Sequence, residues 1–297
     1  MSRRYPAIRL PPEEDDPSLF DSLALNFFMP HSHGVVAPRV LRSLETFLRA
    51  IPPGTMKQYL DVEGEWRRLD EEGWHRMREE GFTLPGLEAS KVILSSEYAA
   101  GRYHAFHYTG RWLENPEYQH VRTRTSAVSF TLPTGYLEQQ GPGPVRALAL
   151  ALAAELPFSF GYGTLALVMD CLMPQATRSV LQAWPGLDVC ELDAASHSIG
   201  TGARGAYWLT FLGPPLLRQV GGLETLRQRL PFPDVSFHSL DEERVLLTLG
   251  EWPIIEEAGP SLRALACLLE PFFPQEKIPA LSSHQEDIDR WMRRFCG

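Results

Sequence analysis

The sequence lacks long apolar runs and clustered cysteines, and both absences restrict the class of protein. Only four of its 297 residues are cysteine, at positions 171, 190, 267 and 296, and none forms a C-x-x-C pair. Isolated cysteines of this kind are typical of reduced cytosolic thiols that serve mostly as small core residues. The longest apolar run, residues 147–156 with Glu155 as its one charged residue, is well short of the roughly 20 residues that cross a bilayer.

An excess of basic charge is also missing. The chain has 28 Lys and Arg against 37 Asp and Glu, a net charge of −9. This balance excludes a general nucleic-acid binder, which needs a basic surface. The first 16 residues do not resemble a signal peptide, so we expect a cytoplasmic protein without membrane contact. The acidic balance either favours a basic protein partner or only keeps the chain in solution.

Motifs for nucleophilic catalysis or nucleotide binding are absent or lack their context. No G-x-S-x-G occurs, so His197, between two serines, has no nucleophile elbow to serve. Residues 200–205, GTGARG, match G-x-G-x-x-G but lead into a predicted strand instead of a helix. We interpret them as a turn and expect no cofactor.

Histidine pairs give the one candidate for a metal site. His31 and His33 flank Ser32 after a predicted strand, and two such histidines can share a metal ion. The spacing indicates no third ligand, so we expect no metal, and a metal-dependent hydrolase using this pair stays an alternative. His104 and His107 lie on opposite faces of a predicted strand and therefore cannot share one site.

Periodicity predicts an α+β (mixed α/β) fold with a mostly antiparallel sheet and helices packed on its faces. Two hairpins, at 89–108 and 235–249, indicate antiparallel pairing. Further strands are predicted at 19–29, 56–65, 124–132 and 206–212, whereas residues 158–170 are an apolar stretch punctuated by glycines. Helices are predicted from Pro38 to Ile51, at 70–80 with Asp70 as N-cap, and at 145–155, 175–184, 216–220, 223–230, 260–269 and 283–295 with Ser283 as cap. We expect loops at 81–86 and 194–205.

One domain accounts for most of the chain. We expect residues 1–18 to be a flexible N-terminal segment and residues 19–297 to form a single compact domain. Two related lobes, 19–157 and 158–297, are an alternative division of that domain.

Acidic residues gather in three stretches that are candidates for partner binding. Each stretch is either a solvated face or a surface that presents carboxylates to a basic partner. The candidate residues are Glu63, Glu65, Asp70, Glu71 and Glu72; Asp241, Glu242 and Glu243; and Glu251, Glu256 and Glu257.

Three ordered motifs carry a family resemblance. They are FSFGYGTLAL at 158–167, PGLDV at 185–189 and GAYWLTFLGPPLLRQVGG at 205–222. In this order they resemble a family of type VI secretion immunity proteins that are paired with VRR-NUC nuclease toxins. The resemblance extends roughly over residues 19–269.

The resemblance implies a cytoplasmic antidote that binds a nuclease effector stoichiometrically and catalyses nothing. The effector would have a PD-(D/E)xK-type fold, with an acidic metal centre in a cleft that accepts nucleic acid. An acidic inhibitor covering that cleft would compete with DNA. The shared motifs consist of glycines and large apolar residues and so indicate scaffold. No contact residue is carried over from them, and a structural subunit of the secretion apparatus remains a further alternative.

Overall fold

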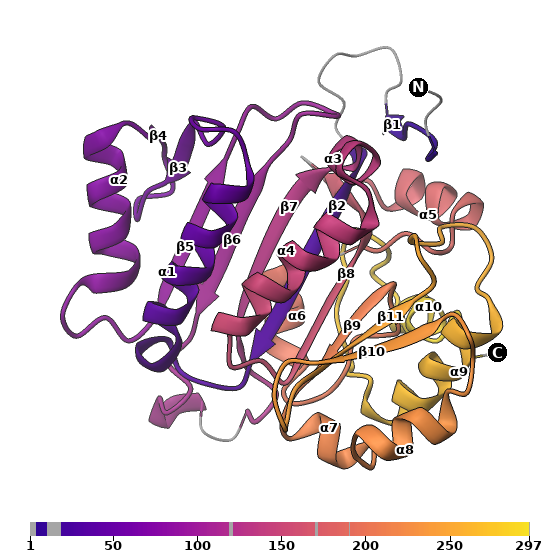
Figure 1. The fold of residues 1–297 in the computed structure, drawn as a ribbon. Coiled ribbons are helices and arrows are strands. Elements are labelled where there is room, and N and C mark those ends of the chain that lie inside the picture. Colours follow the sequence, from indigo (N-terminus) through magenta and orange to yellow (C-terminus); the bar gives the residue numbers. More distant parts are fainter. Residues whose placement is uncertain (1–3, 11–18, 119–120, 170–171, 190, 297) are drawn as a thin grey trace.

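The computed structural model describes residues 4–10, 19–118, 121–169, 172–189 and 191–296. They form an α+β fold around an eleven-stranded antiparallel sheet, as the sequence predicts (Figure 1). The strand order is β10-β11-β9-β8-β2-β7-β6-β5-β3-β4, with β1 beside β2. The strands are β1 Arg9–Leu10, β2 Leu19–Met29, β3 Gln58–Leu60, β4 Trp66–Arg68, β5 Ser90–Ser95, β6 Ala105–Gly110, β7 Ser126–Pro133, β8 Phe160–Met169, β9 Leu209–Leu212, β10 Val235–Ser239 and β11 Val245–Leu249.

Strand β2 lies at the centre of the sheet and has the bounds that its apolar run predicts. It pairs with β7 on one side and with β8 on the other, and it is buried on both faces. Gly161 and Gly163 of β8 allow this close packing. A Cβ atom at these positions would lie 2.5 Å from the Phe27 ring and 2.6 Å from Leu25.

Helices cover both faces of the sheet. On one face lie α1 (His33–Ala50), α3 (Thr134–Gln140) and α4 (Pro142–Glu155) (Figure 1). Their apolar residues, Phe47 and Leu152 among them, pack with Phe27 and Phe130 of the sheet. A second apolar cluster contains Phe160. It includes residues of α6 (Leu192–Ser198), α7 (Leu216–Gln219), α8 (Gly222–Arg229) and α9 (Pro260–Leu269). The remaining α-helices are α2 (Glu71–Arg78), α5 (Pro174–Ala183) and α10 (Gln285–Met292).

Two helix starts differ from the prediction. Helix α1 begins at His33 instead of Pro38, because the Val35 and Val36 N–H groups already donate to the Ser32 carbonyl. Pro38 removes only one N–H from an early turn, so the helix continues through it. Helix α10 begins after His284, and Ser283 is not its cap.

Two predicted loops are partly helical. Residues Glu79–Thr83 continue α2 as a π-helical turn, and Leu192–Ser198 form α6. In α6, buried Ala195 and Ser196 face the sheet, so packing imposes a helix on a stretch of small residues with little propensity of its own. The expectation that the cysteines are mostly core residues does not hold for Cys267, which is exposed; Cys296 is half-buried, and Cys171 and Cys190 fall outside the described residues.

Part of the N-terminal segment contacts the rest of the chain. Residues 4–10 are described, and the buried Tyr5 hydroxyl donates to the Pro253 carbonyl at 2.9 Å.

The division into lobes at residue 157 stays a prediction, and the two halves meet where β2 pairs with β8. Within the described residues, no helix is both long and apolar enough to span a membrane.

Candidate partner-binding site

The three acidic stretches lie at opposite ends of the sheet. The first surrounds β3, β4 and α2, whereas the other two flank β10 and β11. Neighbouring strands are about 4.8 Å apart, so the two ends of this sheet are about 40 Å apart. A standard interface of about 800 Å² per partner is only about 30 Å across. The predicted residues therefore do not form one site.

The hairpin of the first stretch is built on Asp61. Its carboxylate accepts hydrogen bonds from the Glu63 N–H at 3.0 Å, the Glu65 N–H at 2.8 Å and the Arg67 Nε at 2.7 Å. The hydrogen bond from Arg67 and those from the backbone lower the pKa of Asp61. The bonds close the β3–β4 turn and leave the side chains of Glu63 and Glu65 exposed.

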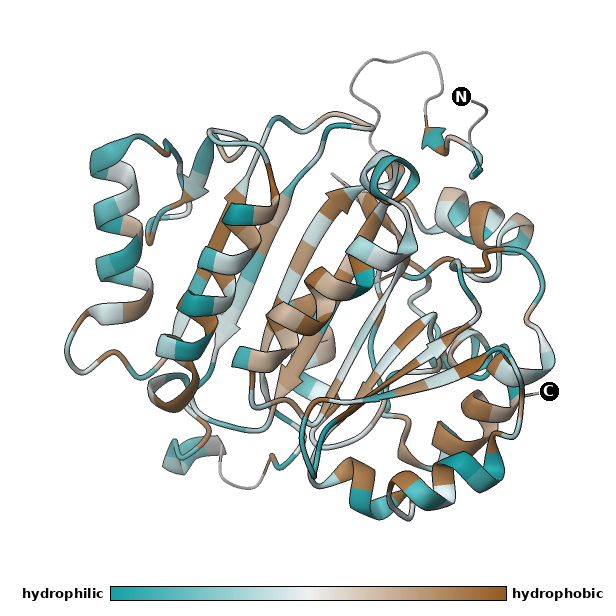
Figure 2. Cartoon of the chain, viewed as in Figure 1, coloured by the Kyte–Doolittle hydropathy of each residue, from teal (hydrophilic) through white to brown (hydrophobic). Residues whose placement is uncertain are grey.

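Helix α2 begins as predicted. The Asp70 carboxylate accepts from the Gly73 N–H at 3.0 Å and caps the helix, and Glu71 and Glu72 lie in its first turn. Gly73 explains how close the helix lies to the hairpin, because a Cβ atom there would be 2.3 Å from the Arg68 carbonyl oxygen. Most of α2 is hydrophilic, in contrast to the helices on the sheet (Figure 2).

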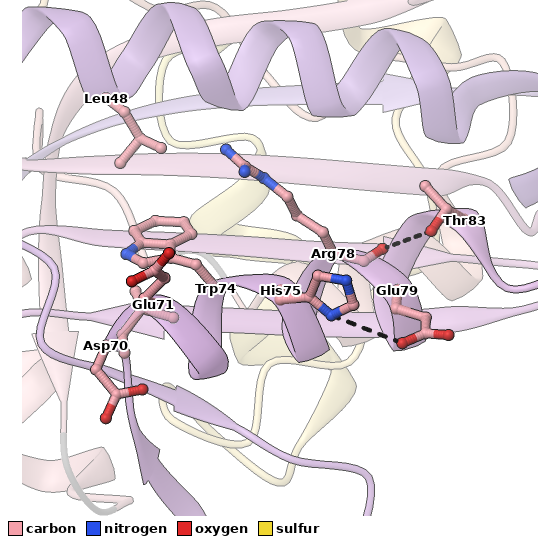
Figure 3. A pocket seen from close by; sticks show the side chains of 9 residues that line it. Leu48, Asp70, Glu71, Trp74, His75, Arg78, Glu79 and Thr83 are labelled. Carbon is pink, nitrogen blue, oxygen red and sulfur yellow. Dashed lines mark hydrogen bonds and ion pairs between the residues drawn. The ribbon is translucent and has the colours of Figure 1, made fainter.

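A groove of about 920 Å³ runs between α1 and α2 (Figure 3). Leu48, Leu69 and Trp74 give it an apolar wall, and the Arg78 guanidinium lies 5.7 Å from the centre of the Trp74 ring. Carboxylates line its rim. We use the name α2 surface for the hairpin residues 61–66 together with the groove residues Leu48, Asp70, Glu71, Trp74, Arg78 and Glu79.

The second stretch, Asp241–Glu243, forms the β10–β11 turn and is largely neutralised by arginine. Arg244 Nε donates to Asp241 at 2.7 Å, and Arg218 lies 3.1 Å from Glu243. Burial acts to raise the pKa of Asp241, but the bond and charge of Arg244 together with backbone hydrogen bonds outweigh it, so the pKa is lowered. A cavity of about 500 Å³ beside the turn also contains Arg39 and His31, so its charges are mixed.

The third stretch lies in the loop after β11. Glu251, Glu256 and Glu257 are exposed, and Arg263 lies 3.1 Å from Glu257. Ile254, between them, is 41% exposed. This stretch is acidic and carries one exposed apolar side chain.

The geometry does not support a metal site at His31 and His33. His33 is buried, its Nδ1 is 2.9 Å from the Tyr108 hydroxyl, and burial lowers its pKa. His31 lines the cavity beside Asp241, where burial and Arg39 lower its pKa. In the part of the chain that the structure describes, no three His, Cys, Asp or Glu residues are arranged to hold a metal ion.

The other histidines lie apart from one another. His104 Nδ1 contacts the Arg102 carbonyl at 2.8 Å, whereas His107 Nε2 lies 3.6 Å from an Asp193 carboxylate oxygen. His197 is in α6, and burial with nearby Arg111 and Arg124 lowers its pKa. They do not gather into one site.

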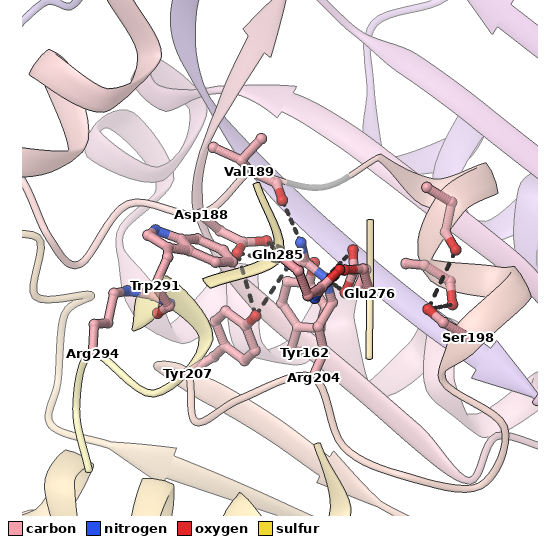
Figure 4. A network of polar contacts seen from close by, with 12 residues as sticks. Tyr162, Asp188, Val189, Ser198, Arg204, Tyr207, Glu276, Gln285, Trp291 and Arg294 are labelled. Atoms are coloured by element: carbon pink, nitrogen blue, oxygen red, sulfur yellow. Dashed lines mark hydrogen bonds and ion pairs between the residues drawn. The ribbon is translucent and has the colours of Figure 1, made fainter. Parts of the chain in front are cut away.

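A buried ionic network, which the sequence did not predict, lies between the sheet and α10 (Figure 4). Arg204 and its two partners, Asp188 and Glu276, have fully buried side chains. Arg204 Nη1 lies 2.8 Å from both Asp188 oxygens, and its Nε lies 2.9 Å from Glu276 Oε2. Burial acts to lower the pKa of Arg204, but the two carboxylates outweigh it and raise the pKa above its ordinary value.

Two tyrosines complete this network. The Tyr162 hydroxyl donates to Asp188 at 2.7 Å and also accepts from Arg204 at 3.2 Å. The rings of Tyr162 and Tyr207 stack with centroids 3.9 Å apart. The three family motifs thus meet here, because they contribute Tyr162, Asp188 and Tyr207, and Arg204 directly precedes the third. Full burial makes the network a structural element, and GTGARG supplies an interior arginine instead of a phosphate loop.

Comparisons with known proteins agree with the sequence motifs. A family model described as type VI immunity for VRR-NUC matches residues 39–295. No curated protein matches the chain. The solved structure of the Pseudomonas aeruginosa T6SS protein PA0821 is similar in fold, with a TM-score of 0.73 and 18% identity over 95% of this chain and 83% of that one. The chain therefore belongs to the family of type VI immunity proteins for VRR-NUC.

Proposed function

We propose that this protein binds a cognate VRR-NUC effector and neutralises it as a stoichiometric inhibitor. The match of the family model over residues 39–295 carries this proposal. The net charge of −9 supports it, because a nuclease must hold phosphates with positive charge and an acidic protein complements such a surface. The effector would act on DNA inside the cell, so the inhibitor works in the cytoplasm.

Inhibition follows from covering the nucleic-acid cleft. An inhibitor that lies over the cleft excludes DNA sterically, and its carboxylates replace the phosphates as partners of the basic side chains. The protein needs no chemistry of its own for this, and it acts as a binding protein instead of an enzyme. The buried position of His33 and its contact with Tyr108 support this choice over a hydrolase.

Co-expression tests the proposal. The cognate VRR-NUC effector is produced in a host cell with and without the chain, and growth is recorded. We expect growth to be restored and the two proteins to elute as one complex. If growth is not restored and no complex forms, the proposal is contradicted. An unrelated protein of similar size and net charge is the control for non-specific neutralisation.

Titration distinguishes a stoichiometric inhibitor from an enzyme that inactivates its target. DNA cleavage by the purified effector should stop at a fixed molar ratio of inhibitor, since each molecule occupies one effector. If the inhibitor covers the cleft, its apparent Kd should rise with the concentration of added DNA. An apparent Kd that is independent of DNA would place inhibition outside the cleft.

A further inference from the structure

The acidic charge of the chain is concentrated around α2. Residues 61–88 contain nine acidic and four basic residues, a net charge of −5 out of −9 for the whole chain. At the groove, the carboxylate of Glu71 is exposed and has no hydrogen bond or ion pair among the described residues. This end of the molecule therefore presents negative charge that the fold does not consume.

Apolar side chains are exposed in the same place. Val62 is 81% exposed and Trp66 is 49% exposed, both on the hairpin that leads into the groove. Tryptophan is enriched among the residues that dominate binding energy at interfaces. The acidic turn at β10–β11 has no such side chain, since residues 241–243 are all carboxylates.

The groove itself accommodates a cationic side chain. Arg78 already places its guanidinium 5.7 Å from the Trp74 ring, with Glu71 and Glu79 on the rim (Figure 3). Aromatic faces attract guanidinium groups, and carboxylates nearby add charge attraction. The wall of Leu48 and Trp74 thus already holds one cation, Arg78, and Glu71 on the rim is the carboxylate that is open to an arginine or lysine from a partner.

The dimensions fit one protein partner. Helix α2 with its π-helical turn is about 20 Å long, and the β3–β4 hairpin lies beside its first turn. The α2 surface therefore lies within the roughly 30 Å width of a standard interface of about 800 Å² per partner. We propose that the α2 surface docks the basic nucleic-acid-binding face of the VRR-NUC effector, with Trp66 and Glu71 as contact residues. This inference rests on the proposed function.

A pair of matched variants tests the location. The first carries Glu63→Lys, Trp66→Ala and Glu71→Lys on the α2 surface. The second carries Glu242→Lys, Glu251→Lys and Ile254→Ala at the opposite end of the sheet. Both replace two exposed glutamates and one exposed apolar side chain, so net charge changes equally. Thermal unfolding of each full-length variant checks that the fold is retained.

Biolayer interferometry against the cognate VRR-NUC effector gives the Kd of each protein. We expect the first variant to bind about 100-fold more weakly, as for loss of one dominant apolar contact and two charges. The second should stay within about threefold, because it changes only long-range attraction. The docking location would be overturned, but not the proposed function, by equal Kd values for wild type and the first variant. A larger loss of affinity in the second variant than in the first would have the same meaning. No binding by the wild type would overturn both.

Discussion

The Arg204 network and the α2 surface are both rich in charge, but they use it in opposite ways. In the network every charged group is buried and paired, and its members come from sequence-distant segments. In the α2 surface most charged side chains are exposed and come from one continuous stretch; Asp61 pairs with Arg67, whereas Glu71 has no partner among the described residues. Charge that holds a fold together is thus consumed by internal partners, whereas charge available to another protein must stay unpaired. A count of acidic residues does not separate the two uses.

The largest effect is expected from breaking the network. Arg204→Ala leaves two buried carboxylates without their cation, so we expect the free energy of unfolding to fall by about 3–5 kcal/mol. Urea denaturation followed by circular dichroism measures the change. Arg67→Ala, which removes an exposed partner of Asp61, is the control and should leave the denaturation midpoint unchanged. Similar midpoints for both variants would contradict the structural role of Arg204.

A smaller effect is expected where α2 packs on β4. Gly73→Ala places a Cβ atom 2.3 Å from the Arg68 carbonyl oxygen, so the helix must move, at a cost of about 1–3 kcal/mol. Gly34→Ala is the matched control, because Gly34 also lies in the first turn of a helix and has open space around it. Differential scanning calorimetry should show a lower Tm for the first variant only. Equal Tm values would mean that α2 does not pack as described.

The N-cap of α2 is expected to contribute less. Asp70→Ala removes the acceptor of the Gly73 N–H, and such losses cost about 1 kcal/mol. Asp70→Ser keeps an acceptor oxygen and should restore most of the stability while removing the charge. Effector binding by the two variants then separates the two roles of this residue. If both variants bind the effector more weakly, the charge of Asp70 contributes to effector binding at the α2 surface.

The smallest effect concerns a carboxylate of intermediate exposure. Burial acts to raise the pKa of Asp193, but contacts from His107, Lys91 and Thr109 outweigh it and lower the pKa. The folded state therefore binds fewer protons than the unfolded chain at acidic pH. The stabilisation is complete above the unfolded pKa of about 4 and is lost as pH falls toward the folded pKa.

Asp193→Asn removes this pH dependence. We expect the stability difference between wild type and variant to be constant above about pH 5 and to shrink below about pH 4. Denaturation midpoints at several pH values measure it. A difference that grows on acidification would contradict the lowered pKa. Asp287→Asn is a suitable comparison, because Asp287 in α10 has a similar exposure and pairs with Arg290 and Ser282.

The sequence predicts elements that are stabilised by contacts between neighbouring residues, and strands that are buried on both faces. Strand β2 is apolar throughout because both faces are covered, so its bounds follow from composition. The Asp70 cap follows from helix chemistry alone. The hairpin β5–β6 was predicted, although its connection runs through residues 96–104 instead of a tight turn at 100–101.

The Arg204 network and the groove could not be predicted, because each depends on contacts between distant segments. Nothing in the surroundings of Asp188 or Glu276 distinguishes them from surface carboxylates in the sequence. The groove exists only because Leu48 of α1 lies opposite Trp74 of α2. Sequence reasoning found the acidic residues at this site but missed its apolar wall. The exposed pair Val62 and Trp66, separated by three polar or glycine residues, was the available signal.

The position of the β3–β4 hairpin at the end of the sheet also determines which changes in chain length the fold tolerates. Strand β3 pairs inward only through Gln58 and Tyr59, opposite Ser95 and Leu94 of β5. β4 is the last strand, so a residue inserted or deleted in the turn at 61–65 shifts no inner strand. In β2 or β8 the same change would reverse the buried faces of a central strand. Insertions and deletions are therefore absorbed at the α2 end, where the turn can lengthen or shorten while the core keeps its register.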